Sequence, residues 1–127
     1  MTAVIMMLVT TCRGLGAFTT GNDLYGMCTS SGEPFMDCIG YVRGVLDAGD
    51  YEGDAQGLIK ELQQGIYSPG STIGGWRWCE PKGMTLGQAV DVVTKYLRDN
   101  PQLRHHGGAL LIVKAMHEAW PCPLPRH

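Results

Sequence analysis

Two cysteine-containing stretches decide the fold of this 127-residue chain. The first, "WRWCEPKGMTLGQ" at residues 76–88, places Cys79 after two tryptophans and shortly before a helix start. The second, "AWPCPLP" at residues 119–125, holds Cys122 between two prolines, after the last predicted helix has ended. A cysteine before one helix and another after a later helix are typical of a disulfide that ties the two helices together. We therefore predict a rigid helical body that is cross-linked in an oxidising compartment.

Size and composition describe one globular domain. The chain has 127 residues, of which 44% are hydrophobic and 17% are charged, and this length has room for a single core. The formal net charge is -2, so the sequence lacks the basic footprint of a protein that binds DNA or RNA. We therefore expect no nucleic-acid partner.

The N-terminal residues differ in character from the rest of the chain. Every residue from Ala3 to Val9 is apolar, a run too short to span a bilayer but typical of a secretory signal peptide. Small residues at positions 14, 16 and 17 offer a cleavage site. We predict a signal peptide at residues 1–17, followed by one domain at 18–127 and no membrane association after its removal. No basic residue precedes the apolar run, so a buried N-terminal element and a lipid anchor on Cys12 are alternatives.

Removal of the signal peptide would also remove Cys12 and leave four cysteines. These are Cys28, Cys38, Cys79 and Cys122. An even number of cysteines in a small exported chain predicts two disulfides, although four cysteines allow three pairings. The predicted helix ends favour Cys79 with Cys122 and Cys28 with Cys38. Loop-closure entropy assigns roughly 3 kcal/mol to the shorter loop and about 4 kcal/mol to the longer one.

Helical periodicity dominates the sequence. Thr20 begins a helix that ends near Cys28, with Asp23 in its first turn, and Thr85 and Gln88 form a T-x-x-Q capping box at the start of another. The predicted helices after the first cover residues 34–48, 54–64, 85–100 and 109–120. Because no strand-like alternation stands out, we predict an all-α fold, a compact bundle of four to five short helices cross-linked by two disulfides. The stretch "SPGSTIGG" at residues 68–75 is predicted to be loop.

No constellation in the sequence indicates catalysis or metal binding. A cysteine with His117 could form a nucleophile–base pair, but a disulfide sulfur is no nucleophile. His105 and His106 are expected to point apart, and the chain has no C-x-x-C motif. The acidic residues in 47–54 fit no EF-hand loop and are interpreted as a solvated loop. We therefore predict no enzyme activity, no metal and no cofactor.

Two surface segments are candidates for binding a partner. In one, Trp76 and Trp78 flank Arg77, and tryptophan and arginine are frequent in binding hot spots. Alternation allows at most one of the two rings to pack inward, and a core tryptophan beside a ring that covers the disulfide is an equally good interpretation. The other segment is the polar helix connection "RDNPQLRHHGG" at residues 98–108, which can also be explained by solubility alone.

Four longer segments resemble a known family. They are "TGNDLYGMC", "CIGYVRGVLDA", "CEPKGMTLGQAVDVVTKYLRDNPQL" and "ALLIVKAMHEAWPCP". Together they are similar to the Rap/Tai immunity proteins, the amidase-immunity family of type VI secretion, over most of residues 18–123. The most specific motifs are C-x-P-x-G-x-T-x-x-Q before a helix and the closing A-x-P-C, whereas residues 49–76 depart from the family pattern.

The resemblance implies an HdeA-like helical protein of the periplasm with internal disulfides. Family members bind a toxic peptidoglycan amidase, often as dimers, and occlude its active site, so the expected partners are an amidase effector and a second copy of the chain. The candidate contacts are the predicted hairpin loop with Asp99, Asn100, Arg104, His105 and His106, and then Trp76, Arg77 and Trp78. The alternative is an HdeA-like acid-stress chaperone or another small periplasmic binding protein.

Overall fold

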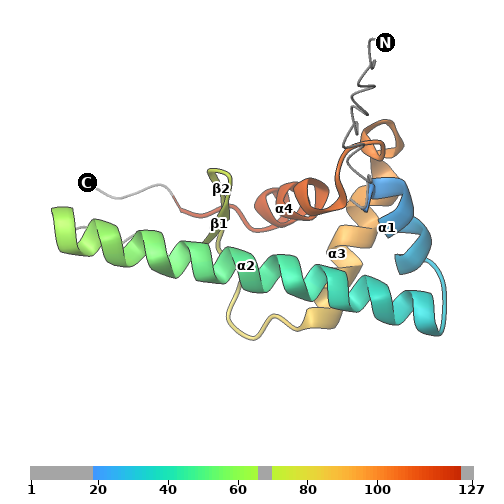
Figure 1. The fold of residues 1–127 in the computed structure, drawn as a ribbon, viewed down its shortest axis with the longest axis horizontal. Helices are drawn as coiled ribbons and strands as arrows, with labels where there is room; N and C mark the ends of the chain where they lie inside the picture. The colour runs from blue at the N-terminus through green and yellow to red at the C-terminus, as the bar shows by residue number, and fades with distance from the viewer. Residues whose placement is uncertain (1–18, 66–69, 124–127) are drawn as a thin grey trace, which may run out of the picture.

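The computed structural model describes residues 19–65 and 70–123. Its elements, in chain order, are α1 (Gly21–Cys28), α2 (Glu33–Gln64), β1 (Ser71–Ile73), β2 (Trp76–Trp78), α3 (Leu86–Asp99), the 3-10 turn η1 (Pro101–Leu103) and α4 (Gly108–Ala119). The long α2 extends along the whole body, and the other elements lie against it or at one of its ends (Figure 1). The predicted signal peptide and Cys12 lie outside the described residues.

Helix α2 corrects the prediction of two shorter helices separated by an acidic loop. It is one continuous helix of 32 residues, so the prediction that all helices would be short is also wrong. No proline interrupts residues 47–54, and the side-chain amide of Gln56 donates to Glu52 one turn earlier, at 3.0 Å. The helix ends where the sequence predicted, with Gly65 in the left-handed conformation at φ 65°. The acidic residues therefore occupy a helix surface instead of a flexible loop.

The helix carries glycines in its interior because other elements approach it very closely there. Gly49 and Gly53 lie one turn apart and are both buried. A Cβ on Gly49 would lie 2.2 Å from the ring of Trp78, and a Cβ on Gly53 would lie 2.3 Å from the carbonyl oxygen of Gly70. Any larger residue would push the hairpin away, so these two glycines position the strands against α2.

The strands form a two-stranded antiparallel hairpin, which corrects the all-α prediction to a mostly helical fold with a small sheet. Ser71 pairs with Trp78 and Ile73 with Trp76. Gly74 and Gly75 form the two-residue connection with φ of 58° and 83°, as a type I′ hairpin turn requires. Strands of three residues are too short to show alternation, which is why residues 71–73 were predicted to be loop.

Both predicted disulfides are confirmed. Cys28 bonds to Cys38 and Cys79 bonds to Cys122, with Cα–Cα distances of 5.1 and 4.8 Å. The backbone N–H of Cys79 also donates to the carbonyl of Trp120 at 2.9 Å, so the second bridge closes beside a main-chain hydrogen bond. The start of α3 and the end of α4 are thereby held together, which is what the opening stretches of sequence predict.

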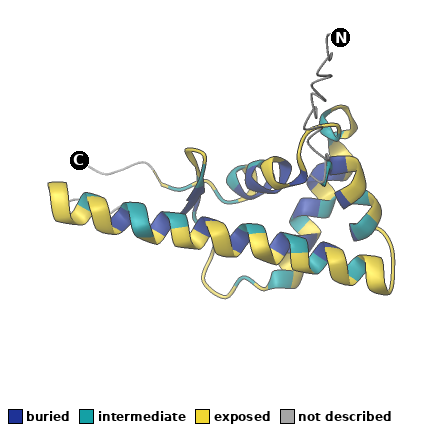
Figure 2. Ribbon diagram, viewed as in Figure 1, coloured by how far each residue is buried: buried dark blue, intermediate teal, exposed yellow. Residues whose placement is uncertain are grey.

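The core lies where α1, α3 and α4 meet the first half of α2 and the hairpin (Figure 2). The largest fully buried side chains are Trp78, Leu24, Leu97, Leu111, Ile112 and Met116. The predicted capping residues are confirmed, since the hydroxyls of Thr20 and Thr85 accept from the backbone N–H groups of Asp23 and Gln88. Among the described residues, no helix combines the length and the apolar character that crossing a membrane requires.

Helices α3 and α4 are neighbours, but they cross instead of forming the expected antiparallel hairpin (Figure 1). Their connection contains the turn η1 and then pairs with the start of α1 through a bridge between Thr20 and Gly107. This additional contact redirects the chain, so α4 runs back toward the hairpin and brings Trp120 beside Cys79.

Candidate partner-binding site

The backbone of the α3–α4 connection is fixed by the first turn of α1. The N–H of Gly21 donates to the carbonyl of His106 at 2.8 Å, and the N–H of Asn22 donates to the carbonyl of Arg104 at 2.9 Å. The first N–H groups of a helix have no partner within the helix, so the connection supplies acceptors that α1 needs. The segment 99–106, which we call the α3–α4 loop, is therefore held in one conformation by main-chain bonds.

Three of the predicted contact residues in this loop already interact within the protein. The carboxylate of Asp99 pairs with the ammonium of Lys95 at 2.6 Å, and the side-chain amide of Asn100 donates to the carbonyl of Tyr96 at 2.9 Å. The guanidinium of Arg104 lies 4.2 Å from the centre of the Tyr25 ring. These three side chains therefore stabilise the conformation of the loop and are less available to contact a partner.

In the α3–α4 loop, the structure leaves His105 and His106 exposed, together with the ion-paired Asp99. Their rings are 4.1 Å apart and tilted by 36°, so the expectation that adjacent histidines would point apart is wrong. The half-exposed side chain of Leu110 follows on α4. The loop therefore presents two neighbouring imidazoles on a backbone that α1 holds in place.

The second candidate segment, residues 76–78, lies at the other end of α4. Trp78 is fully buried, whereas Trp76 is 39% exposed, which confirms the expectation that only one ring packs inward. The Trp76 ring meets the His117 ring edge-on at 5.0 Å, and Nδ1 of His117 is 2.5 Å from the carbonyl oxygen of Arg77. The twelve residues of α4 separate the two candidate segments by about 18 Å, so they form two separate surfaces.

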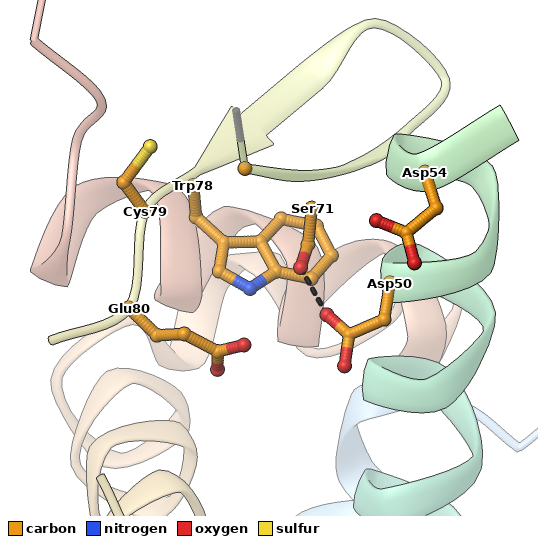
Figure 3. Close-up of a pocket in the computed structure, with 7 residues that line it drawn as sticks. Asp50, Asp54, Ser71, Trp78, Cys79 and Glu80 are labelled. Atoms are coloured by element: carbon orange, nitrogen blue, oxygen red, sulfur yellow. Dashed lines mark hydrogen bonds between the residues drawn. The ribbon is translucent and has the colours of Figure 1, made fainter. Parts of the chain in front are cut away.

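An acidic pocket is a feature that the sequence did not reveal. Asp50 and Asp54 come from one face of α2 and face Glu80, which follows β2 (Figure 3). With Ser71 and Trp78 they line a pocket of about 410 Å³. Asp50 and Asp54 are four residues apart, so recognising the helix would have placed both carboxylates on one face. We call this feature the acidic pocket.

Electrostatics within the acidic pocket favour a protonated Glu80. Partial burial raises the pKa of the Glu80 carboxyl, and the charge of Asp50 together with a hydrogen bond between the two carboxyl groups raises it further. The hydroxyl of Ser71 donates to Asp50. Within the described part of the chain, no group of three Cys, His, Asp or Glu side chains could hold a metal ion.

Comparison with known protein families identifies the family to which this chain belongs. The sequence model of the Rap1a immunity proteins matches residues 20–122, which is most of the chain. This chain belongs to the Rap1a immunity protein family. Membership indicates an immunity protein directed against a secreted effector, hence a protein partner and an inhibitory role instead of an enzymatic one. No curated protein and no solved structure matches the chain significantly.

Proposed function

We propose that this Rap1a-family protein acts in the periplasm and protects its cell from a peptidoglycan amidase delivered by type VI secretion. In this proposal it binds the amidase and covers the active site with the α3–α4 loop. The observation that carries the proposal is the exposed His105–His106 pair on a loop whose backbone is bonded to α1. Family membership supports an effector as the partner, and the two disulfides agree with an oxidising compartment.

The mechanism we infer is steric occlusion by a preformed loop. Two crossing helices and the first turn of α1 order the loop before binding, so little conformational entropy is lost when it enters a substrate groove. The disulfide between Cys79 and Cys122 fixes the far end of α4 to the start of α3. No group on the protein has to react, because a filled groove excludes the peptidoglycan substrate.

Binding to the purified amidase tests this mechanism. We expect the His105→Ala, His106→Ala double variant to weaken binding by more than about tenfold, since exposed aromatic groups at a rigid centre carry much of an interface's energy. Lys82→Ala, which changes an exposed residue on another loop, is the matched control and should bind normally. Arg104 stays unchanged in this test because its contact with Tyr25 supports the loop. Unaltered affinity of the histidine variant would move the interface elsewhere, and the segment at 76–78 would be tested next.

A second copy of the chain is the further partner that we propose, through the side of α2 opposite its buried glycines. Tyr51, Leu58 and Leu62 are 78%, 57% and 77% exposed there. Gly40 and Gly44 lie on the same side, eleven and seven residues before Tyr51, and a Cβ on either would meet nothing. Two antiparallel α2 helices related by a two-fold axis at Tyr51 would place each leucine over a glycine of the other copy, an isologous contact. The large leucines of one copy would therefore fit against the small glycines of the other.

Sedimentation equilibrium tests the dimer. The wild-type protein should sediment as a dimer at micromolar concentration, and Leu58→Glu should give a monomer with unchanged helical content. Lys60→Glu, a change of charge on the side of α2 away from Leu58, is the control and should remain dimeric. A monomeric wild type would contradict this part of the proposal without affecting the effector interface.

The alternative function is an HdeA-like periplasmic acid-stress chaperone, and the HdeA-like architecture stays a prediction. Exposed apolar side chains on α2 and the acidic pocket are features that such a chaperone could use at low pH. The two functions differ in selectivity. A chaperone would suppress aggregation of unrelated proteins near pH 3, whereas an immunity protein binds one effector at neutral pH. The periplasmic location itself is tested by finding a processed N-terminus near residue 18 in exported material.

A further inference from the structure

The acidic pocket contains a buried polar group that no other part of the protein satisfies. Trp78 has no exposed surface, and its indole Nε1 has no hydrogen-bond partner among the described residues. Figure 3 shows this nitrogen facing the space between the carboxyl groups of Glu80 and Asp50. A buried N–H without an acceptor is destabilising, so native proteins seldom leave one without a functional reason.

The carboxyl groups that face the indole N–H disfavour each other's charge. Partial burial and the charge of Asp50 raise the pKa of the Glu80 carboxyl, and Asp50 accepts from the Ser71 hydroxyl. Asp54 adds a third acidic group to the pocket wall, on the exposed side of α2. An adjoining hollow of about 180 Å³ shares Asp50 and Glu80 and adds one further carboxylate, Asp47, and one cation, Arg43. The described residues that line the acidic pocket therefore include three acidic side chains and no cation.

A cation that pairs with these carboxyl groups has to be larger than a metal ion. The described Asp and Glu side chains do not converge closely enough to hold a metal. A guanidinium group carries five N–H donors spread over a planar fork and can pair with more than one carboxylate at a time. An ammonium is a compact, strongly hydrated point charge and fits such a spread of acceptors less well.

We propose that the acidic pocket receives an arginine side chain of the effector, with its guanidinium between the carboxylates of Asp50, Asp54 and Glu80. The guanidinium offsets the repulsion between the Asp50 and Glu80 carboxylates, and Glu80 accepts the N–H of Trp78 in the complex. The identity of the partner rests on the proposed function. The arginine would be a second point of contact with the effector, separated from the α3–α4 loop by about the length of α4.

The indole N–H of Trp78 reports directly on this site in a ¹H–¹⁵N NMR correlation spectrum. The probe is N-acetyl-arginine methylamide, added to the oxidised protein without any effector, so failure here is distinguishable from failure of the proposed function. Trp76→Phe and Trp120→Phe assign the three indole signals. We expect a saturable shift of the Trp78 signal with the arginine probe and none with the citrulline analogue, which has the same shape but no charge.

Two variants and one control complete the test. Asp54→Asn and Glu80→Gln should abolish the shift, and both keep the bond between Ser71 and Asp50 intact. Asp91→Asn removes an exposed carboxylate of α3 outside the pocket and should leave the shift unchanged. An unmoved Trp78 signal, an equal response to citrulline, or full binding by either pocket variant would overturn the proposal. Stronger binding of spermidine than of the arginine probe would also overturn it, in favour of a free polyamine.

Discussion

Because the hairpin lies so close to α2, the same substitution, Gly→Ala, should have opposite effects on stability at different glycines. At an exposed helix position, Gly→Ala stabilises a protein by up to about 1 kcal/mol, because alanine has the higher helix propensity. At Gly49 the added methyl group would lie 2.2 Å from a ring carbon of Trp78, where carbon atoms normally stay about 3.5 Å or more apart. Trp78 is fully buried and cannot swing aside, so either the indole or the helix has to move by more than about 1 Å.

The expected magnitude follows from overpacking. Inserting a methyl group into a well-packed core costs roughly 1–3 kcal/mol, and this cost exceeds the gain in helix propensity. Gly53→Ala should behave in the same way, because its Cβ would meet the backbone at Gly70, which cannot rotate away as a side chain can. Gly26→Ala is the matched control, since Gly26 lies in α1 with nothing within 4 Å of the added atom.

Urea unfolding followed by circular dichroism at 222 nm measures these differences. We expect Gly49→Ala and Gly53→Ala to lower the free energy of unfolding by about 1–3 kcal/mol, and Gly26→Ala to leave it equal or raise it by up to about 1 kcal/mol. The near-ultraviolet signal of the tryptophans should change for Gly49→Ala. If the first two variants were as stable as the wild type, the packing of the hairpin on the glycines of α2 would be refuted.

Three further predictions concern the disulfides, Glu80 and the first helix cap. Replacing Cys79 and Cys122 by serine should lower the free energy of unfolding by about 4 kcal/mol. The same change at Cys28 and Cys38 should lower it by about 3 kcal/mol, because that bridge spans 10 residues and the other spans 43. Chemical unfolding of both variants checks the order. The pKa of Glu80 is raised in the folded protein, so folding favours the protonated carboxyl. This stabilising contribution is complete below the ordinary pKa of 4.5 and is lost as the pH rises through the raised pKa. Glu80→Gln should therefore raise the melting temperature at pH 7, with the advantage shrinking toward pH 4, and a constant difference would contradict the assigned cause. Thr20→Ala removes the hydroxyl that caps α1, while the backbone N–H of residue 20 can still donate to the Asp23 carboxylate and hold its pKa low, so it should cost about 1 kcal/mol in the same unfolding assay.

The helix termini other than the break predicted between residues 48 and 54 could be predicted from the sequence, because local chemistry determines them. Thr85 and Gln88 form a capping pair whatever the rest of the chain does, and Pro101 ends α3 because it cannot continue the helix. The disulfide pairing followed from the same helix ends, since a cross-link has to join positions that the helices bring together. These features depend on a few residues that are close in the sequence.

The continuity of α2 could not be predicted because its cause is tertiary. Glycine in a helix interior is unfavourable by about 1 kcal/mol, so Gly49 and Gly53 indicate a loop when they are considered alone. Their role becomes clear only when Trp78 and the backbone of β1 lie against them. The hairpin was missed for the same reason, since three-residue strands gain most of their stability from packing on α2.

The candidate site was predicted in part. The α3–α4 loop was identified from its polar composition, but the anchoring of Arg104 on Tyr25 depends on α1, which is far away in sequence. The acidic pocket was missed because Asp50 and Glu80 are thirty positions apart and Asp50 was assigned to a loop. Long-range contacts of this kind leave no periodic signal in the chain.

Inhibition of the effector is the most direct test of the central claim that this protein protects its cell by covering an amidase active site. The measurement is the rate at which the purified amidase releases peptides from peptidoglycan, with increasing amounts of the oxidised immunity protein. The account predicts complete inhibition near one immunity chain per amidase, and loss of that inhibition when His105 and His106 are both alanine. An amidase that stays fully active in the presence of excess wild-type protein would contradict it.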